Sequence, residues 1–142
     1  FLLCTLCVLH CLCLISETTN ALLVLFAIQP SRISCLLLAS PFLYAIDHQA
    51  ALYAMLAVDL IFCILRSARY HRVSAPSYLL ALQFPCFLFS ALILVAAFWS
   101  TRRRPLEFVE SPVPDCSPPS IFHPEIRVAW EWSNLFLCLL VV

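Results

Sequence analysis

Glycine and lysine are both absent from this chain of 142 residues. Without glycine it has no dinucleotide-binding fingerprint, no glycine-rich loop to cradle phosphate and no Gly-xxx-Gly contact between transmembrane helices. Because lysine is missing, arginine supplies all eight basic residues, and eight acidic residues balance them. The chain therefore lacks the excess positive charge that nucleic-acid binding requires.

Charged residues of any kind are scarce, since they make up 11% of the chain, whereas 63% of residues are hydrophobic. An ordinary soluble domain carries about 25% charged residues. With so few, the chain cannot cover a globular surface in water. The composition predicts an integral, multi-pass membrane protein.

The longest apolar run covers residues 78–99, interrupted by Gln83, Pro85 and Ser90. As a helix rising about 1.5 Å per residue it reaches about 33 Å, more than the hydrocarbon core of about 30 Å. It keeps no polar stripe of the kind that a helix on the surface of a soluble protein needs. We therefore predict a membrane span here.

The earlier apolar segments divide less cleanly, because polar residues interrupt them. Residues 1–15 lack a basic lead-in and a cleavage site of small residues, so we interpret them as part of a span. Residues 21–28 are too few to cross alone, and we favour one kinked helix over 21–43 followed by a helix over 44–65. In the alternative interpretation, residues 29–32 form a turn at the membrane surface and residues 21–28 are interfacial or re-entrant.

Residues 100–132 differ from the rest in their prolines and acids. Proline interrupts helices and the acids disfavour lipid, so we predict an aqueous loop or linker. A further span is expected over 133–142, because Trp130 and Trp132 before it are typical of the membrane interface.

Together these segments predict an all-α, polytopic transmembrane helical bundle of about four to five spans, with residues 1–99 as its main part. Because the chain starts at Phe1 and stops within an apolar run, we expect a fragment truncated at both ends.

Two arginine clusters flank the span over 78–99. The first consists of Arg66, Arg69, His71 and Arg72, and the second of residues 102–104. Arginines near span ends favour the cytoplasmic side, so a single crossing makes one cluster break this rule. We place the first cluster in a cytosolic loop.

Two charged residues, Arg32 and Asp59, fall inside predicted spans. An arginine near mid-membrane costs about 2.5 to 3.5 kcal/mol on insertion scales. Intramembrane acids face a partner or a polar pathway. We expect Asp59 to pair with Arg32 or Arg66 and so to fix helix packing, and a substrate or proton pathway is the alternative.

Nine cysteines are present, and eight of them lie in apolar segments, where free cysteine packs as a small hydrophobe. Cys4, Cys7 and Cys11 share one helical face near His10, and such ligands suit zinc or copper. A rigid helix seldom closes three ligands around one ion. We expect packing here, with no metal and no cofactor.

No catalytic motif stands out in the chain. Asp47-His48 and His123-Pro-Glu125 combine acids with imidazole, but both fall in predicted turns with no nucleophile fixed nearby by spacing. We predict no catalytic residue.

The pattern His71-Arg72-x-x-x-Pro76-Ser77-x-Leu-Leu-x-Leu joins two predicted spans. It resembles the cytosolic loop in the extra N-terminal membrane domain of fungal multidrug-resistance-type ABC transporters of the C subfamily. The resemblance covers residues 66–82, and the proline-rich stretch at 105–124 departs from that family. It implies a non-catalytic accessory domain of about five helices, with ATP hydrolysis in a domain that this chain does not contain.

The residues alone leave a second class open, a small membrane transporter or a lipid-handling membrane enzyme. Its polar groups would gather in the bundle, namely Arg32, Asp47, His48 and Asp59. In either class we expect the lipid bilayer as a partner, together with further transmembrane helices of the same protein or a partner subunit. Nucleic acid is not an expected partner.

Overall fold

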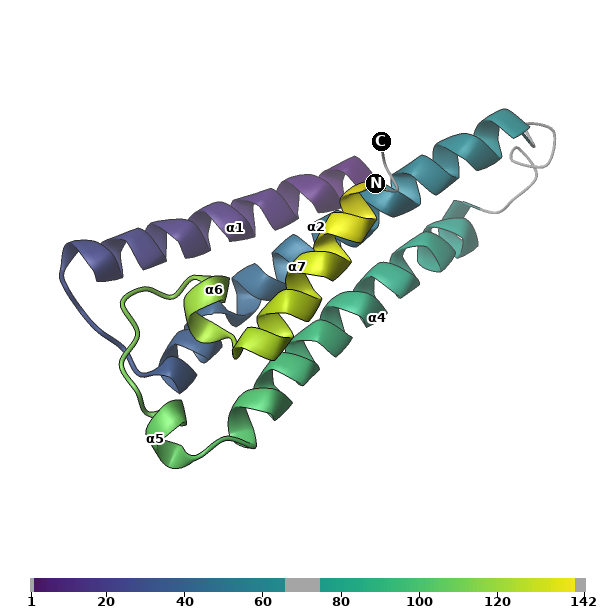
Figure 1. The fold of residues 1–142 in the computed structure, drawn as a ribbon. Coiled ribbons are helices and arrows are strands. Elements are labelled where there is room, and N and C mark those ends of the chain that lie inside the picture. Colours follow the sequence, from purple (N-terminus) through teal and green to yellow (C-terminus); the bar gives the residue numbers. More distant parts are fainter. Residues whose placement is uncertain (1, 66–74, 140–142) are drawn as a thin grey trace.

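The structure, a computed structural model, describes residues 2–65 and 75–139. The elements of this part of the chain are the helices α1 (Leu2–Leu25), α2 (Arg32–Leu65), α4 (Ala75–Arg102), α5 (Leu106–Val109), α6 (Pro118–Ile121) and α7 (Pro124–Leu139). The central helix is α2, which contacts each of the others. The short helices α5 and α6 lie at one end of the bundle (Figure 1). The predicted all-α polytopic bundle is confirmed.

Three helices of the described residues, α1, α2 and α4, are long and apolar enough to cross a membrane. Large apolar side chains stay exposed along them, such as Leu25, Leu65 and Leu80. A soluble monomer rarely exposes such large apolar faces to water, whereas lipid solvates them. The chain is an integral, multi-pass membrane protein whose helices contact the bilayer.

The favoured division of residues 21–65 into two helices is wrong. The structure breaks the chain between Leu25 and Arg32, where the alternative interpretation placed a turn, and residues 44–65 are the second half of α2. Hydropathy could not locate this break, because the residues on either side of it are equally apolar.

A Schellman turn ends α1. The N–H of Ile28 donates to the carbonyl of Leu23, and the N–H of Ala27 donates to that of Val24. Ala27 has φ 52°, the left-handed conformation that this turn requires. Glycine is the residue most often found at such a position, and this chain has none.

The polar residues 16–20 lie inside α1, although one span was predicted to end at residue 15 and the next helix to begin at residue 21. Thr18 Oγ1 donates a 2.7 Å hydrogen bond to the carbonyl of Leu14, and Thr19 Oγ1 a 2.9 Å bond to that of Ile15. Hydroxyls that bond back to the preceding turn satisfy themselves inside a helix. These polar side chains are therefore accommodated within a single span.

Pro41 lies inside α2 without ending it. A proline has no N–H to offer the carbonyl four residues earlier, here that of Leu37. The hydroxyl of Ser40 donates to this carbonyl instead, at 2.8 Å. The missing backbone bond is thus replaced locally, as the low-polarity surroundings demand.

The span predicted over residues 78–99 forms the greater part of α4. The predicted loop over 100–132 is shorter in the structure, since α4 continues to Arg102 and α7 begins at Pro124 rather than near residue 133. Proline caused this error, because it disfavours helix interiors but suits a first helical turn. Pro118 and Pro124 begin α6 and α7 in this way.

Candidate functional site

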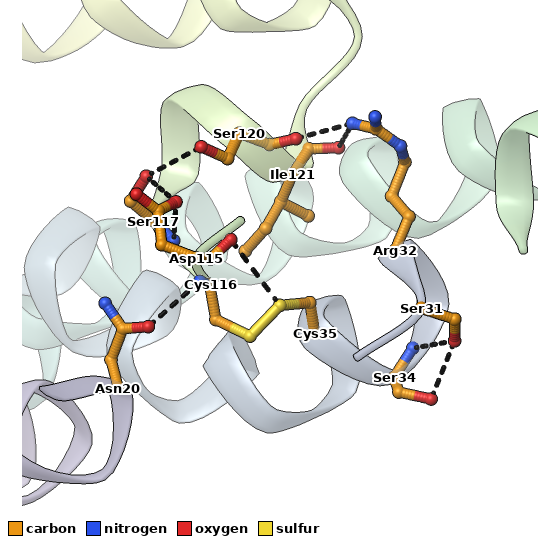
Figure 2. Close-up of a disulfide and its surroundings, with 10 residues drawn as sticks. All are labelled: Asn20, Ser31, Arg32, Ser34, Cys35, Asp115, Cys116, Ser117, Ser120 and Ile121. Atoms are coloured by element: carbon orange, nitrogen blue, oxygen red, sulfur yellow. Dashed lines mark hydrogen bonds between the residues drawn. A yellow bond between two sulfur atoms is a disulfide. The ribbon is translucent and has the colours of Figure 1, made fainter. Parts of the chain in front are cut away.

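A disulfide closes one end of the bundle (Figure 2). It joins Cys35, near the start of α2, to Cys116, between α5 and α6, with the Cα atoms 5.1 Å apart. Both residues are buried. Asn20 of α1 accepts a 2.9 Å hydrogen bond from the backbone N–H of Cys116. The segment after α4 is therefore attached to both α1 and α2.

This bond was not predicted, because the cysteines were interpreted as small apolar side chains. The usable signal was Cys116, the one cysteine outside an apolar segment. Its partner could not be chosen, since eight other cysteines were available. Within residues 2–65 and 75–139, seven cysteines are free and no three His, Cys, Asp or Glu side chains gather as metal ligands. Cys4, Cys7 and Cys11 are exposed on α1.

Arg32 holds the same segment from the first turn of α2 (Figure 2). Its Nη1 donates to the carbonyl oxygens of Ser120 and Ile121, at the end of α6, where carbonyls have no partner within the helix. Its guanidinium carbon lies 4.3 Å from the centre of the Phe108 ring, a cation–π contact. Arg32 therefore organises the closed end.

The expected placement of Arg32 near mid-membrane, and its pairing with Asp59, are thus corrected. Arg32 begins α2, and Asp59 lies about 40 Å farther along the same helix at about 1.5 Å per residue. The two side chains cannot meet, because a straight helix separates them. The error followed from dividing α2 into parts of two helices.

Two backbone hydrogen bonds also join this segment to the chain before α2. The N–H of Arg32 donates to the carbonyl of Ser111 at 3.0 Å, and the N–H of Val113 to that of Pro30 at 3.1 Å. They form an isolated antiparallel bridge. A disulfide, side-chain hydrogen bonds from Arg32 and backbone hydrogen bonds thus converge on residues 111–121.

Asp115 lies within the same segment. Hydrogen bonds from Ser120 and Ser117 lower the pKa of its carboxyl group. The Ser117 hydroxyl donates to Oδ1 at 2.7 Å. This carboxylate therefore keeps its negative charge at neutral pH.

The second arginine cluster lies at the same end. Arg104 Nη2 lies 3.2 Å from both Glu125 Oε2 and His123 Nδ1. The guanidinium carbon of Arg103 lies 4.5 Å from the centre of the Trp99 ring. The pair His123 and Glu125 thus contacts Arg104, two residues after the end of α4.

A buried polar bridge links α2 to α7. Asp47 is fully buried, and its Oδ1 accepts hydrogen bonds from Trp130 Nε1 at 2.8 Å and Asn134 Nδ2 at 3.0 Å. Its Oδ2, and Nδ1 of the neighbouring His48, are buried with no partner in the described part of the chain. Residues 47–49 were expected in a turn, yet they lie inside α2. A buried carboxylate with one oxygen unsatisfied is costly, which marks Asp47 as a functional candidate.

Asp59 is tied to α4 instead of to an arginine. The hydroxyl of Tyr78 donates a 2.6 Å hydrogen bond to its Oδ1. The ring of Tyr78 stacks on Phe62, with centroids 6.0 Å apart. This contact joins the far ends of α2 and α4, away from the disulfide.

The remaining predicted candidates lie outside the described residues. They are Arg66, Arg69, His71 and Arg72. Their role stays a prediction.

Comparison with known families gives a match over the whole chain. The model of a family described as the serpentine type 7TM GPCR chemoreceptor Srsx matches residues 1–142, which is the whole chain. No curated protein and no solved structure matches.

This match corrects two interpretations. The resemblance to an ABC transporter accessory domain is wrong, and so is the transport function that it implied. Neither a small transporter nor a lipid-handling enzyme gains support. The pattern from His71 to Leu82 misled because its parts are general: arginine favours a membrane boundary, proline begins a helix and leucine fills a span.

Proposed function

We infer, from the premise that this chain belongs to the serpentine 7TM GPCR chemoreceptor family Srsx, that it acts as a membrane receptor for small molecules. The observation that carries this proposal is the family match over the whole chain. The fold supports it, because α2 connects a closed end, held by the disulfide, to a far end held by Asp59 and Tyr78. Helix α2 thus connects the disulfide to the hydrogen bond between Asp59 and Tyr78.

We place the disulfide end outside the cytoplasm. Disulfides persist in oxidising compartments, whereas cytosolic thiols are kept reduced. The ends of α2 and α4 that flank residues 66–74 then face the cytosol, which agrees with the arginines in that segment. The cluster at 102–104 is the one that breaks the arginine rule, and Glu125 offsets part of its charge.

The polar bridge between α2 and α7 is the proposed point at which a ligand acts. Within the residues that the structure describes, no donor reaches Asp47 Oδ2, so a ligand that carries a donor or a positive charge would stabilise this carboxylate. Trp130 and Asn134 approach Asp47 from α7. A ligand that competes for Asp47 would favour one arrangement of α7 against α2 over another.

The partners follow from the exposed faces of the bundle. We propose that further transmembrane helices, of the same protein or of a partner, cover part of these faces. The family is described as seven-transmembrane, and the described residues supply three candidate spans. Lipid contacts the remainder.

The test is ligand-dependent activation of a G protein in cells that express the full chain. The probe is a panel of small organic odorants that includes primary amines. We expect a dose-dependent response to at least one compound, lost in Cys116→Ala, which opens the disulfide. Cys138→Ala, which removes an exposed free cysteine of α7, should keep the response. A chain that reaches the membrane with its disulfide formed and answers no compound contradicts the proposal.

A further inference from the structure

An open apolar groove of about 640 Å³ lies on the outside of the bundle, between α2 and α4, and is bounded by α5. Figure 1 shows α5 beside the end of α4, at the closed end of the molecule. Leu37 of α2, Phe98 of α4 and Leu106 of α5 contribute to its walls. The groove is separate from the polar bridge at Asp47, which does not line it.

The groove continues a lipid-facing surface. Leu94 and Phe98 stand one helical turn apart, so they share one face of α4, and Arg102 follows on that face one turn later. Leu37 and Leu106 are 59% and 74% exposed. An occupant therefore reaches the groove sideways through the bilayer.

Arginine side chains lie at one end of this otherwise apolar groove. Arg102 and Arg104 both line it. Arg104 shares its charge with Glu125, whereas Arg102 is exposed and has no acidic partner within residues 2–65 and 75–139. An uncompensated guanidinium at a membrane boundary attracts a phosphate group.

Apolar walls that end at an unpaired cation match an amphiphile with an anionic head. We propose that the groove holds an anionic phospholipid of the bilayer, with one acyl chain against α2 and α4 and its phosphate at Arg102. A water-soluble peptide fits less well, because the groove opens at the depth of the spans. The proposal does not depend on the receptor function.

Native mass spectrometry of the full chain tests this site. The protein is released from nanodiscs that contain equal amounts of phosphatidylglycerol and phosphatidylcholine. We expect phosphatidylglycerol adducts to exceed phosphatidylcholine adducts about fivefold, the effect of one arginine near a lipid headgroup. Arg102→Gln should abolish this excess. Formation of the Cys35–Cys116 disulfide, read from the same spectra, reports folding.

Two variants make the test specific. Arg103→Gln removes the same charge from the adjacent residue. Arg103 stacks on Trp99, which lines the groove, but does not line the groove itself, so this variant keeps Arg102 in place and should keep most of the excess. Val95→Trp fills the groove and should remove lipid adducts while Arg102 is present. Equal adducts of the two lipids, or equal losses in Arg102→Gln and Arg103→Gln, would overturn the proposal. So would a dimer of the parent chain without bound lipid, since a second copy would then cover the groove.

Discussion

Ala27 holds a left-handed backbone conformation, with φ 52°, at the end of α1. For a residue with a Cβ this conformation costs about 1–2 kcal/mol. Glycine removes that cost, although its greater freedom in the unfolded chain offsets about 0.4–1 kcal/mol. We predict that Ala27→Gly stabilises the protein by about 0.5–1 kcal/mol, measured as a higher Tm in detergent.

The matched control is Ala21→Gly, within the regular part of α1. Glycine in a helix interior is destabilising by about 0.5–1 kcal/mol relative to alanine. The two substitutions should therefore shift Tm in opposite directions. A lower Tm for both would mean that Ala27 is not in the left-handed conformation.

Trp130 and Trp132 lie on the same helix, but only Trp130 reaches Asp47. A hydrogen bond to a charged group contributes about 1.5–3 kcal/mol. We predict that Trp130→Phe lowers the free energy of unfolding by about this amount. Trp132 is 67% exposed, so Trp132→Phe should change it by less than about 0.5 kcal/mol. Chemical denaturation in detergent measures both, and equal effects would contradict the buried bridge.

The sequence showed that Asp47 and the tryptophans were unusual, but not that they meet. Both were assigned from their neighbours in the chain, Asp47 to a turn and Trp130 to the membrane interface. Their contact joins α2 to α7, two helices far apart in sequence. Local composition does not predict such a contact. A polar side chain can bond to water or to a buried partner, and its neighbours in the sequence do not show which of the two it does.

At the level of helices, α2 and α4 are joined at their far ends by Asp59 and Tyr78. Removing either partner, in Asp59→Asn or Tyr78→Phe, weakens the same contact. We predict that the double variant loses less stability than the sum of the single losses. Arg32→Gln combined with Asp59→Asn should instead be additive, because about 40 Å of helix separates the two residues. Thermal unfolding of the three single and two double variants measures this, and coupling between Arg32 and Asp59 would refute the helix bounds.

Element prediction succeeded where composition alone decides the outcome. The apolar run at 78–99 is long enough that its helix follows from the bilayer thickness, and α4 contains it. Prediction failed at residues 16–20 and 47–49, where polar side chains suggested breaks. Threonine hydroxyls donate to carbonyls of the preceding turn of α1, and Oδ1 of Asp47 accepts hydrogen bonds from Trp130 and Asn134 of α7. Polar residues mark helix ends only when nothing inside the bundle can bond them.

At the scale of the whole molecule, the proposed orientation predicts which residues meet each compartment. Glu110 is exposed between α5 and α6. In intact cells, Glu110→Cys should react with a membrane-impermeant maleimide, whereas Arg69→Cys should react only after permeabilisation. The parent chain measures the background from its own cysteines. The opposite pattern would reverse the orientation.

Membrane residence was readable from the sequence, because scarce charge and long apolar runs need no knowledge of contacts. The family was not, since the pattern at His71 is shared by many membrane boundaries. The contacts of the closed end could not be predicted from the sequence, for a different reason. It is built from Cys35 and Cys116, which are 81 residues apart, and from Arg32 and the carbonyls of α6. Only folding brings these groups together.

Formation of the disulfide also depends on whether the helices were inserted correctly into the membrane during synthesis. In the proposed orientation, Cys35 enters the oxidising compartment with the start of α2, but Cys116 reaches it only if α2 and α4 have both crossed the membrane. A molecule in which α4 failed to cross would leave Cys116 in the reducing cytosol and Cys35 unpaired. A cell could therefore distinguish mis-threaded copies by an unpaired thiol at the lumenal surface, and discard them before they leave the compartment where they were made.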